Sequence, residues 1–199
     1  MELIKFNIDK PTPEKIWDVY DHYKRSLDYY FDPSQNVDFK EEFAGLSNEE
    51  IDEQKRSLLD ELSLRSSFYL LTYIETLFRT DFILRIESNK KGYTDILTKE
   101  YKKIYKPTDR LYSYSLKDVI FKNWKRYING KQYSKEMRDI LNTLPQYFDF
   151  RNWIAHGRYW VFKEPNYKQK YNYDQIRIVL SQIETYFGPL LKKKNFGLN

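Results

Sequence analysis

FYLLTYIETLFRTDFILRI, at residues 68–86, is the stretch of sequence that decides the fold. On a helix these apolar side chains cover nearly every face, which is the pattern of a helix buried at the centre of a bundle. Charged residues interrupt the stretch, so it indicates a core helix rather than a membrane span. These residues are Glu75, Arg79, Asp81 and Arg85. The sequence therefore predicts a helical protein built around this segment.

The central helix is predicted to begin well before this stretch. Ser47-Asn48-Glu49-Glu50 matches the capping box, in which Glu50 reaches back to the amide of Ser47. The helical pattern continues to about Glu87, and a break at 63–67 stays open. An earlier helix is predicted from Thr12-Pro13 to Asp32-Pro33, because threonine suits the N-cap and proline the first helical position. A polar connection at 33–46 joins the two helices.

The rest of the chain has helical signals and no alternating strand pattern. Turn and capping residues divide it into helices at 93–105, 115–129, 134–144, 147–155 and 173–187, with a turn at 89–92 and irregular, aromatic residues at 158–172. We therefore expect an all-α protein, an antiparallel helical bundle with additional helices. The prediction is one domain, 1–199, with the first helix and connection in 1–46, the bundle core in 47–187 and a lysine-rich tail in 188–199.

The composition excludes several kinds of site. The chain has no cysteine and two histidines, His22 and His156, which excludes thiolate zinc sites, thiol nucleophiles and histidine-rich metal centres. All six glycines are isolated, which excludes phosphate-binding loops of the Walker and Rossmann types. We expect no cofactor and no metal. The lack of a signal-peptide h-region and of a long apolar run predicts a cytoplasmic protein without a membrane partner.

Charge and aromatic content are consistent with a nucleic-acid partner but do not require one. The formal net charge of +5 suits a polyanion, although a basic protein without such a partner would show the same balance. The many tyrosines and phenylalanines could stack on unpaired bases, but aromatic residues more often fill cores. We expect Trp153 and Trp160 to be packing or interface residues rather than base-stacking platforms, and Lys192–Lys194 to be a solvated tail.

With those kinds of site excluded, the remaining candidate for a catalytic site is the segment 151–157, Arg-Asn-Trp-Ile-Ala-His-Gly. Asn152 and His156 share one helix face at i,i+4. Arg151 lies roughly 140° around the helix axis from His156, but its side chain is long enough to reach the same site. Gly157 predicts that the helix ends at His156, where the dipole favours a protonated imidazole. Arg151 offers a planar fork to phosphate, His156 can exchange protons near neutral pH, and Asn152 can orient either group.

This arrangement suits RNA cleavage without metal. The ribose 2′-OH attacks the adjacent phosphorus while a base removes its proton, an acid protonates the leaving 5′ oxygen and a cation stabilises the transition state. Two proton-handling groups are needed, yet His22 lies in an ordinary helix-surface sequence. We therefore expect a symmetric homodimer, in which two copies of Arg151 and His156 form one composite site.

The pattern resembles a known family. Arg151-Asn152-x-x-x-His156 is similar to the R-x4-6-H motif of the HEPN superfamily, in which a polar residue commonly follows the arginine. Arg158-Tyr159-Trp160 resembles the Arg-Leu-Trp that follows this histidine in Abi-like abortive-infection proteins, and Glu75 with Arg79 resembles the Glu-x-x-x-Arg helix of the same group. Ile154 and Gly157 differ from the commoner residues there.

The resemblance implies a HEPN-type bundle that dimerises through the motif helices and acts as a metal-independent endoribonuclease. It implies catalytic roles for Arg151, Asn152 and His156, and we expect Glu75, Arg79 and Arg158 to support them. Many members act as toxins or phage-defence effectors, and some are held inactive by a partner protein or RNA. RNA and an antitoxin are thus the candidate partners.

Two other interpretations stay open. The chain could be a non-catalytic HEPN-like module that binds a nucleotide, an RNA or a partner protein. It could also be an unrelated helical scaffold in which the motif is accidental. For Glu75 and Arg79, a simple i,i+4 salt bridge on the helix is the alternative to a buried role beside Arg151.

Overall fold

The regular elements are all helices in the part of the chain that the structure describes. The computed structural model describes residues 12–88, 95–130 and 134–191, and these ranges hold helices and turns but no strand. The all-α prediction is confirmed. The turn predicted at 89–92 and the tail at Lys192–Lys194 lie outside the described residues. None of the described helices combines the length and the apolar character that a membrane crossing requires.

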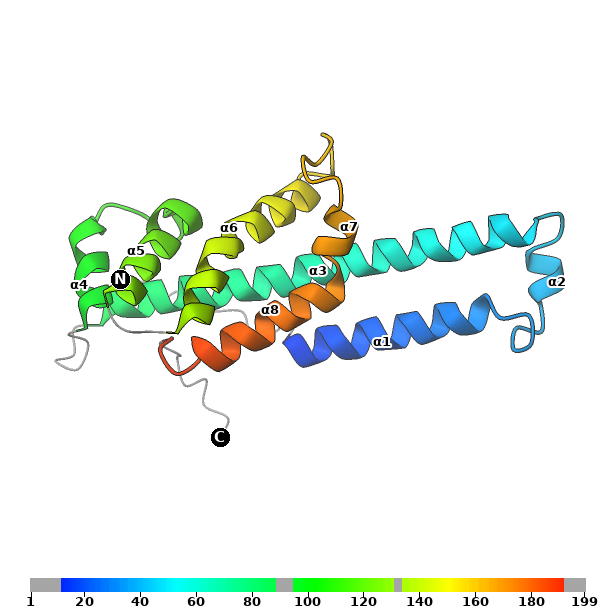
Figure 1. Cartoon of the computed structure of the whole chain (residues 1–199), viewed down its shortest axis with the longest axis horizontal. Coiled ribbons are helices and arrows are strands. Elements are labelled where there is room, and N and C mark those ends of the chain that lie inside the picture. The colour runs from blue at the N-terminus through cyan, green and yellow to red at the C-terminus, as the bar shows by residue number, and fades with distance from the viewer. Residues whose placement is uncertain (1–11, 89–94, 131–133, 192–199) are drawn as a thin grey trace.

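A single helix of 40 residues, α3 (Asn48–Glu87), organises the molecule (Figure 1). The predicted capping box is present at its start, where the Ser47 amide donates to Glu50 and the Glu50 amide donates to the Ser47 hydroxyl. The helix runs through Ser63–Ser67 without a break. At these small serines the backbone of residues 171–173 packs closely against α3. Ser67 Oγ donates to the carbonyl of Tyr171, and Ser63 Oγ accepts from the amide of Tyr173.

The N-terminal part of α3 pairs with α1 (Pro13–Tyr30), and Figure 1 shows the two helices as an arm that extends away from the other helices. Thr12 caps α1 as predicted. The connection predicted as polar contains a short helix, α2 (Phe39–Glu42), and closes the tip of the arm with a small apolar cluster. This cluster consists of Phe31, Phe43 and Ile51. On α3 the main core begins further along, at Leu64.

The C-terminal half of α3 carries the bundle. It contacts α4 (Ile96–Ile104), the π-type turn η2 (Leu116–Phe121), α6 (Lys135–Ala155) and α8 (Tyr173–Tyr186). The remaining elements are the turn η1 (Leu111–Ser113), α5 (Lys122–Asn129), which continues η2, and α7 (Tyr167–Lys170). Fully buried aromatic and aliphatic side chains from these helices fill the core between them. Examples are Ile74, Phe78, Phe82, Trp124, Leu141, Phe150 and Phe187.

The structure corrects the prediction of separate helices at 134–144 and 147–155. Both belong to α6, and Pro145 lies inside it. An interior proline lacks the N–H that would bond the carbonyl four residues earlier, and it costs about 3 kcal/mol relative to alanine. Leu144 and Phe148, on the two sides of the proline, are both buried in the main core. This shared burial holds the helix together across the proline.

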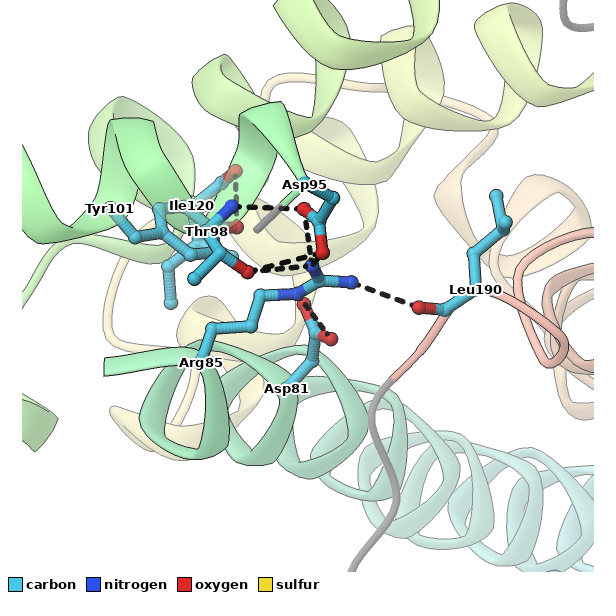
Figure 2. A network of polar contacts seen from close by, with 7 residues as sticks. All are labelled: Asp81, Arg85, Asp95, Thr98, Tyr101, Ile120 and Leu190. Atoms are coloured by element: carbon cyan, nitrogen blue, oxygen red, sulfur yellow. Dashed lines mark hydrogen bonds and ion pairs between the residues drawn. The ribbon is translucent and has the colours of Figure 1, made fainter. Parts of the chain in front are cut away.

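A buried ion-pair network fixes the C-terminal end of α3 (Figure 2). Arg85 is almost completely buried and donates from Nε to the buried carboxylate of Asp81 at 2.7 Å. Its Nη1 bonds to Asp95, the N-cap of α4, and its Nη2 donates to the carbonyl of Leu190. One guanidinium thus ties α3 to α4 and to the segment that follows α8, so these elements meet in a fixed arrangement.

Candidate active site

The candidate site lies at the C-terminal end of α6, which closes in a Schellman motif. The amide of Gly157 donates to the carbonyl of Ile154, and the amide of Arg158 donates to the carbonyl of Trp153. This motif requires a left-handed residue, and Gly157 has φ of +73°. The predicted end of the helix is therefore present, and its hydrogen bonds place His156 at the C-cap.

Arg151 is held against α3 by contacts on several sides. Its Nη2 lies 3.3 Å from Glu75 Oε2, and its Nη1 donates to Asn152 Oδ1 at 3.2 Å. The guanidinium carbon lies 5.2 Å from the centroid of the Phe68 ring, within the range of a cation–π contact. The Nε of Arg151 is buried and has no hydrogen-bond partner among the described residues. The guanidinium is thus fixed in position but retains an unused donor.

Glu75 lies between two arginines. It makes the predicted contact with Arg151, and its other oxygen accepts from Arg79 Nε at 2.7 Å. Arg79 in turn donates from Nη1 to the carbonyls of Tyr112 and Tyr114, which precede η2. The i,i+4 salt bridge and the pairing with Arg151 are therefore both present. Through them the apolar central helix positions the arginine of the motif.

His156 is exposed and its side chain is free. Across the described ranges its imidazole makes no hydrogen bond or ion pair, and its ring lies 6.1 Å from the ring of Trp160. No hydrogen bond, ion pair or ring contact joins it to Arg151, whose side chain turns toward α3. His22, the other histidine, is exposed on α1. One chain therefore presents an accessible imidazole and a fixed guanidinium that do not touch each other.

Arg158 has an unusual backbone conformation, with φ of +61° in a residue that is not glycine. Its guanidinium bonds Glu61 on α3 at 2.8 Å, and Glu61 also pairs with Arg65. Partial burial raises the pKa of the Glu61 carboxyl, but the hydrogen bonds and charges of Arg158 and Arg65 outweigh this effect and leave the pKa below its usual value. The charged carboxylate thus anchors the segment that follows the motif.

A groove of about 530 Å³ lies beside the motif, between α6 and the segment that returns from it. We call it the α6 groove. Gln146, Asp149 and Asn152 line it from α6, and Trp160, Lys163 and Lys170 line it from the returning segment. Trp160 is held there because its carbonyl accepts from Trp153 Nε1 at 2.6 Å.

The sequence identified part of this arrangement and missed part. Trp153 is buried, as predicted, whereas Trp160 is about half exposed and borders the groove. Neither Phe68 beneath Arg151 nor Glu61 beside Arg158 could be predicted, because both contacts join residues far apart in the chain. Asn152 lies between the arginine site and the α6 groove, since it contacts Arg151 and also lines the groove.

The donors needed for a metal site are not gathered in the part of the chain that the structure covers. Within residues 12–88, 95–130 and 134–191 there is no group of three or more histidine, aspartate or glutamate side chains that could hold an ion.

Compared with known proteins, the chain matches no family model, no curated protein and no solved structure.

Proposed function

We propose that this protein is a metal-independent endoribonuclease of the HEPN type. The observation that carries the proposal is the end of α6, where an unpaired, exposed imidazole follows a guanidinium fixed by an ion pair to the central helix. A free imidazole can take up and release protons near neutral pH. A positioned arginine can bind phosphate oxygens without losing its charge. Together they suit a reaction at a phosphodiester.

In the proposed reaction the ribose 2′ oxygen forms a bond to the adjacent phosphorus as a base removes its proton. The bond from phosphorus to the 5′ oxygen breaks, and an acid protonates that oxygen. The products are a 2′,3′-cyclic phosphate and a 5′-hydroxyl. His156 serves as base or acid, Arg151 stabilises the negative charge on the phosphate oxygens, and Asn152 helps to orient Arg151, with which it is hydrogen-bonded.

The separation of Arg151 and His156 within one chain supports a composite site in a homodimer. Each chain offers one imidazole at the end of α6, whereas the reaction uses both a base and an acid. A two-fold axis near the end of α6 would bring a second imidazole and a second guanidinium to the same phosphate. His156 is exposed at this end, so it is accessible to a partner chain and to RNA.

The biological role we propose follows from the Abi-like resemblance of the motif. An RNA-cleaving enzyme of this kind would act as a toxin or as an abortive-infection effector against phage. Its activity would then be restrained by an antitoxin protein or RNA. The substrate is RNA, and neither a metal nor a cofactor takes part in the proposed reaction.

Substitution of the two motif residues tests the proposal. His156→Ala and Arg151→Ala are each expected to abolish cleavage of a single-stranded RNA in EDTA, because each removes a group used in the transition state. The measurement is the loss of full-length, end-labelled RNA over time. The matched control is His22→Ala, which removes the other histidine from an exposed position on α1 and should leave the rate unchanged.

Circular dichroism must show that all three variants are folded. Cleavage that persists in both motif variants would exclude the proposed site. Tight RNA binding by the unmodified protein, without a cyclic-phosphate product, would instead favour a non-catalytic HEPN-like module.

A further inference from the structure

The α6 groove offers an exposed aromatic surface directly beside the candidate catalytic histidine. Trp160 is 48% exposed, although its carbonyl is fixed by the hydrogen bond from Trp153. Its ring is inclined 39° to the ring of His156. Large aromatic side chains that stay exposed at a rigid position are the usual platforms on which unpaired bases stack. The volume of the groove, about 530 Å³, lies in the range of small-molecule sites.

The α6 side of the groove presents a row of hydrogen-bonding groups. Gln146, Asp149 and Asn152 follow one another at intervals of three residues on α6 and line the groove. The oxygen of Gln146 accepts from Lys170 and the oxygen of Asn152 accepts from Arg151, which leaves both amide nitrogens available as donors. The carboxylate between them can accept. Donors on both sides of an acceptor can bond the edge of a nucleobase.

The charges in the groove favour a neutral ligand over a phosphate. Asp149 is paired with Lys117, and Glu164 is paired with Lys170, so the two carboxylates are compensated by lysines. Lys163 is exposed and makes no hydrogen bond or ion pair within the described residues, so it can contact the backbone of a bound strand. Because each carboxylate is already paired with a lysine, an uncharged base can enter the groove without facing an uncompensated carboxylate, and Lys163 is left for the phosphate backbone.

From these three observations we propose that the α6 groove binds one base of a single-stranded RNA, next to the phosphate held by His156 and Arg151. Trp160 stacks on this base, and the amides of Gln146 and Asn152 bond its edge. The inference rests on the proposed function for the identity of the ligand. It adds a site that positions the strand for cleavage, so that the base beside the scissile bond is selected by stacking and hydrogen bonding.

Binding can be measured without cleavage in the His156→Ala protein. The probe is a fluorescein-labelled RNA octamer of mixed sequence, and the measurement is fluorescence anisotropy. Adding Trp160→Ala is expected to weaken binding roughly 5- to 150-fold, because stacking on one aromatic ring contributes about 1–3 kcal/mol per base. Trp160→Phe should keep most of the affinity. Tyr29→Ala, which removes a similarly exposed ring from α1, is the control and should leave affinity unchanged.

The outcomes separate this inference from the proposed function. If Trp160→Ala binds RNA as well as the parent protein, or if the parent protein binds no RNA, the base site is excluded even when the enzyme cleaves. If the unmodified protein cleaves nothing but binding depends on Trp160, the base site stands and the proposed reaction fails. Adenosine and uridine monophosphates are added as competitors. Displacement of the octamer by micromolar nucleotide would assign the groove to free nucleotides and overturn its assignment to RNA.

Discussion

At the scale of single residues, two successive left-handed positions set the geometry of the site. Gly157 and Arg158 both have positive φ, and together they turn the chain away from α6 so that Trp160 returns to the helix. Gly157 predicts the end of the helix from the sequence alone, because glycine is favoured at the left-handed position of a Schellman motif. The positive φ of Arg158 could not be predicted from the sequence, because a residue other than glycine seldom adopts it, and neither could its ion pair with the distant carboxylate of Glu61.

Gly157→Ala is expected to destabilise the protein by about 1–2 kcal/mol, because a Cβ is unfavourable in the left-handed region. The space itself is sufficient, as a Cβ there would meet Tyr159 only at ordinary contact distance, 3.4 Å. Gly157→Asn should lose less, since asparagine tolerates this conformation better. Urea denaturation measures both variants, and equal stability of Gly157→Ala and the unmodified protein would contradict the assigned backbone.

Glu61→Gln tests the anchor of Arg158 through its pH dependence. The folded-state pKa of Glu61 lies below its ordinary value of 4.5, so its charge stabilises the fold above that pH and this contribution is lost as the pH falls through the folded-state pKa. The unfolding free energies of the two proteins should therefore differ at pH 7, and the difference should shrink as the pH falls below 4.5. A difference that is constant from pH 7 to pH 3 would rule out the ionic anchor.

At the scale of elements, local signals were predictable and long-range packing was not. The caps at Thr12, Ser47, Ser115 and Ser134 are all present, because a cap depends on residues within one turn. Pro145 is also a local signal, but it does not break α6, since core packing on both sides outweighs it. The same reason explains why the serines at 63–67 lie in a continuous helix: they are small where another segment crosses.

Arg85 gives a stability prediction at this scale. Arg85→Met leaves the buried carboxylate of Asp81 without its guanidinium, and removing one partner of a buried pair costs about 3–5 kcal/mol. Thermal and urea unfolding should show this loss. Arg25→Met, which removes an exposed arginine from α1, should change stability by no more than ~0.5 kcal/mol. Similar small effects for both substitutions would contradict the role of the network in joining α3, α4 and the segment after α8.

At the scale of the whole molecule, charge is distributed unevenly. Residues 28–53, which include the tip of the arm, carry nine carboxylates and one lysine, so the rest of the chain holds a larger positive excess than its net charge of +5 suggests. RNA should therefore approach the bundle and the end of α6 rather than the arm.

The sequence predicted the all-α fold and the helix end that carries His156. It could not predict the α6 groove, which depends on how residues after the motif fold back.

The central claim is that Arg151 and His156 cleave RNA at a site shared by two chains, without metal. The most direct measurement is mass spectrometry of the RNA ends produced in EDTA by the fraction that sediments at twice the chain mass of 24.5 kDa. We predict 2′,3′-cyclic phosphate and 5′-hydroxyl ends, and no cleavage of an RNA whose 2′ hydroxyls are replaced by hydrogen. Products with 5′-phosphate ends, cleavage of the 2′-deoxy strand, or activity confined to the monomer fraction would contradict the claim.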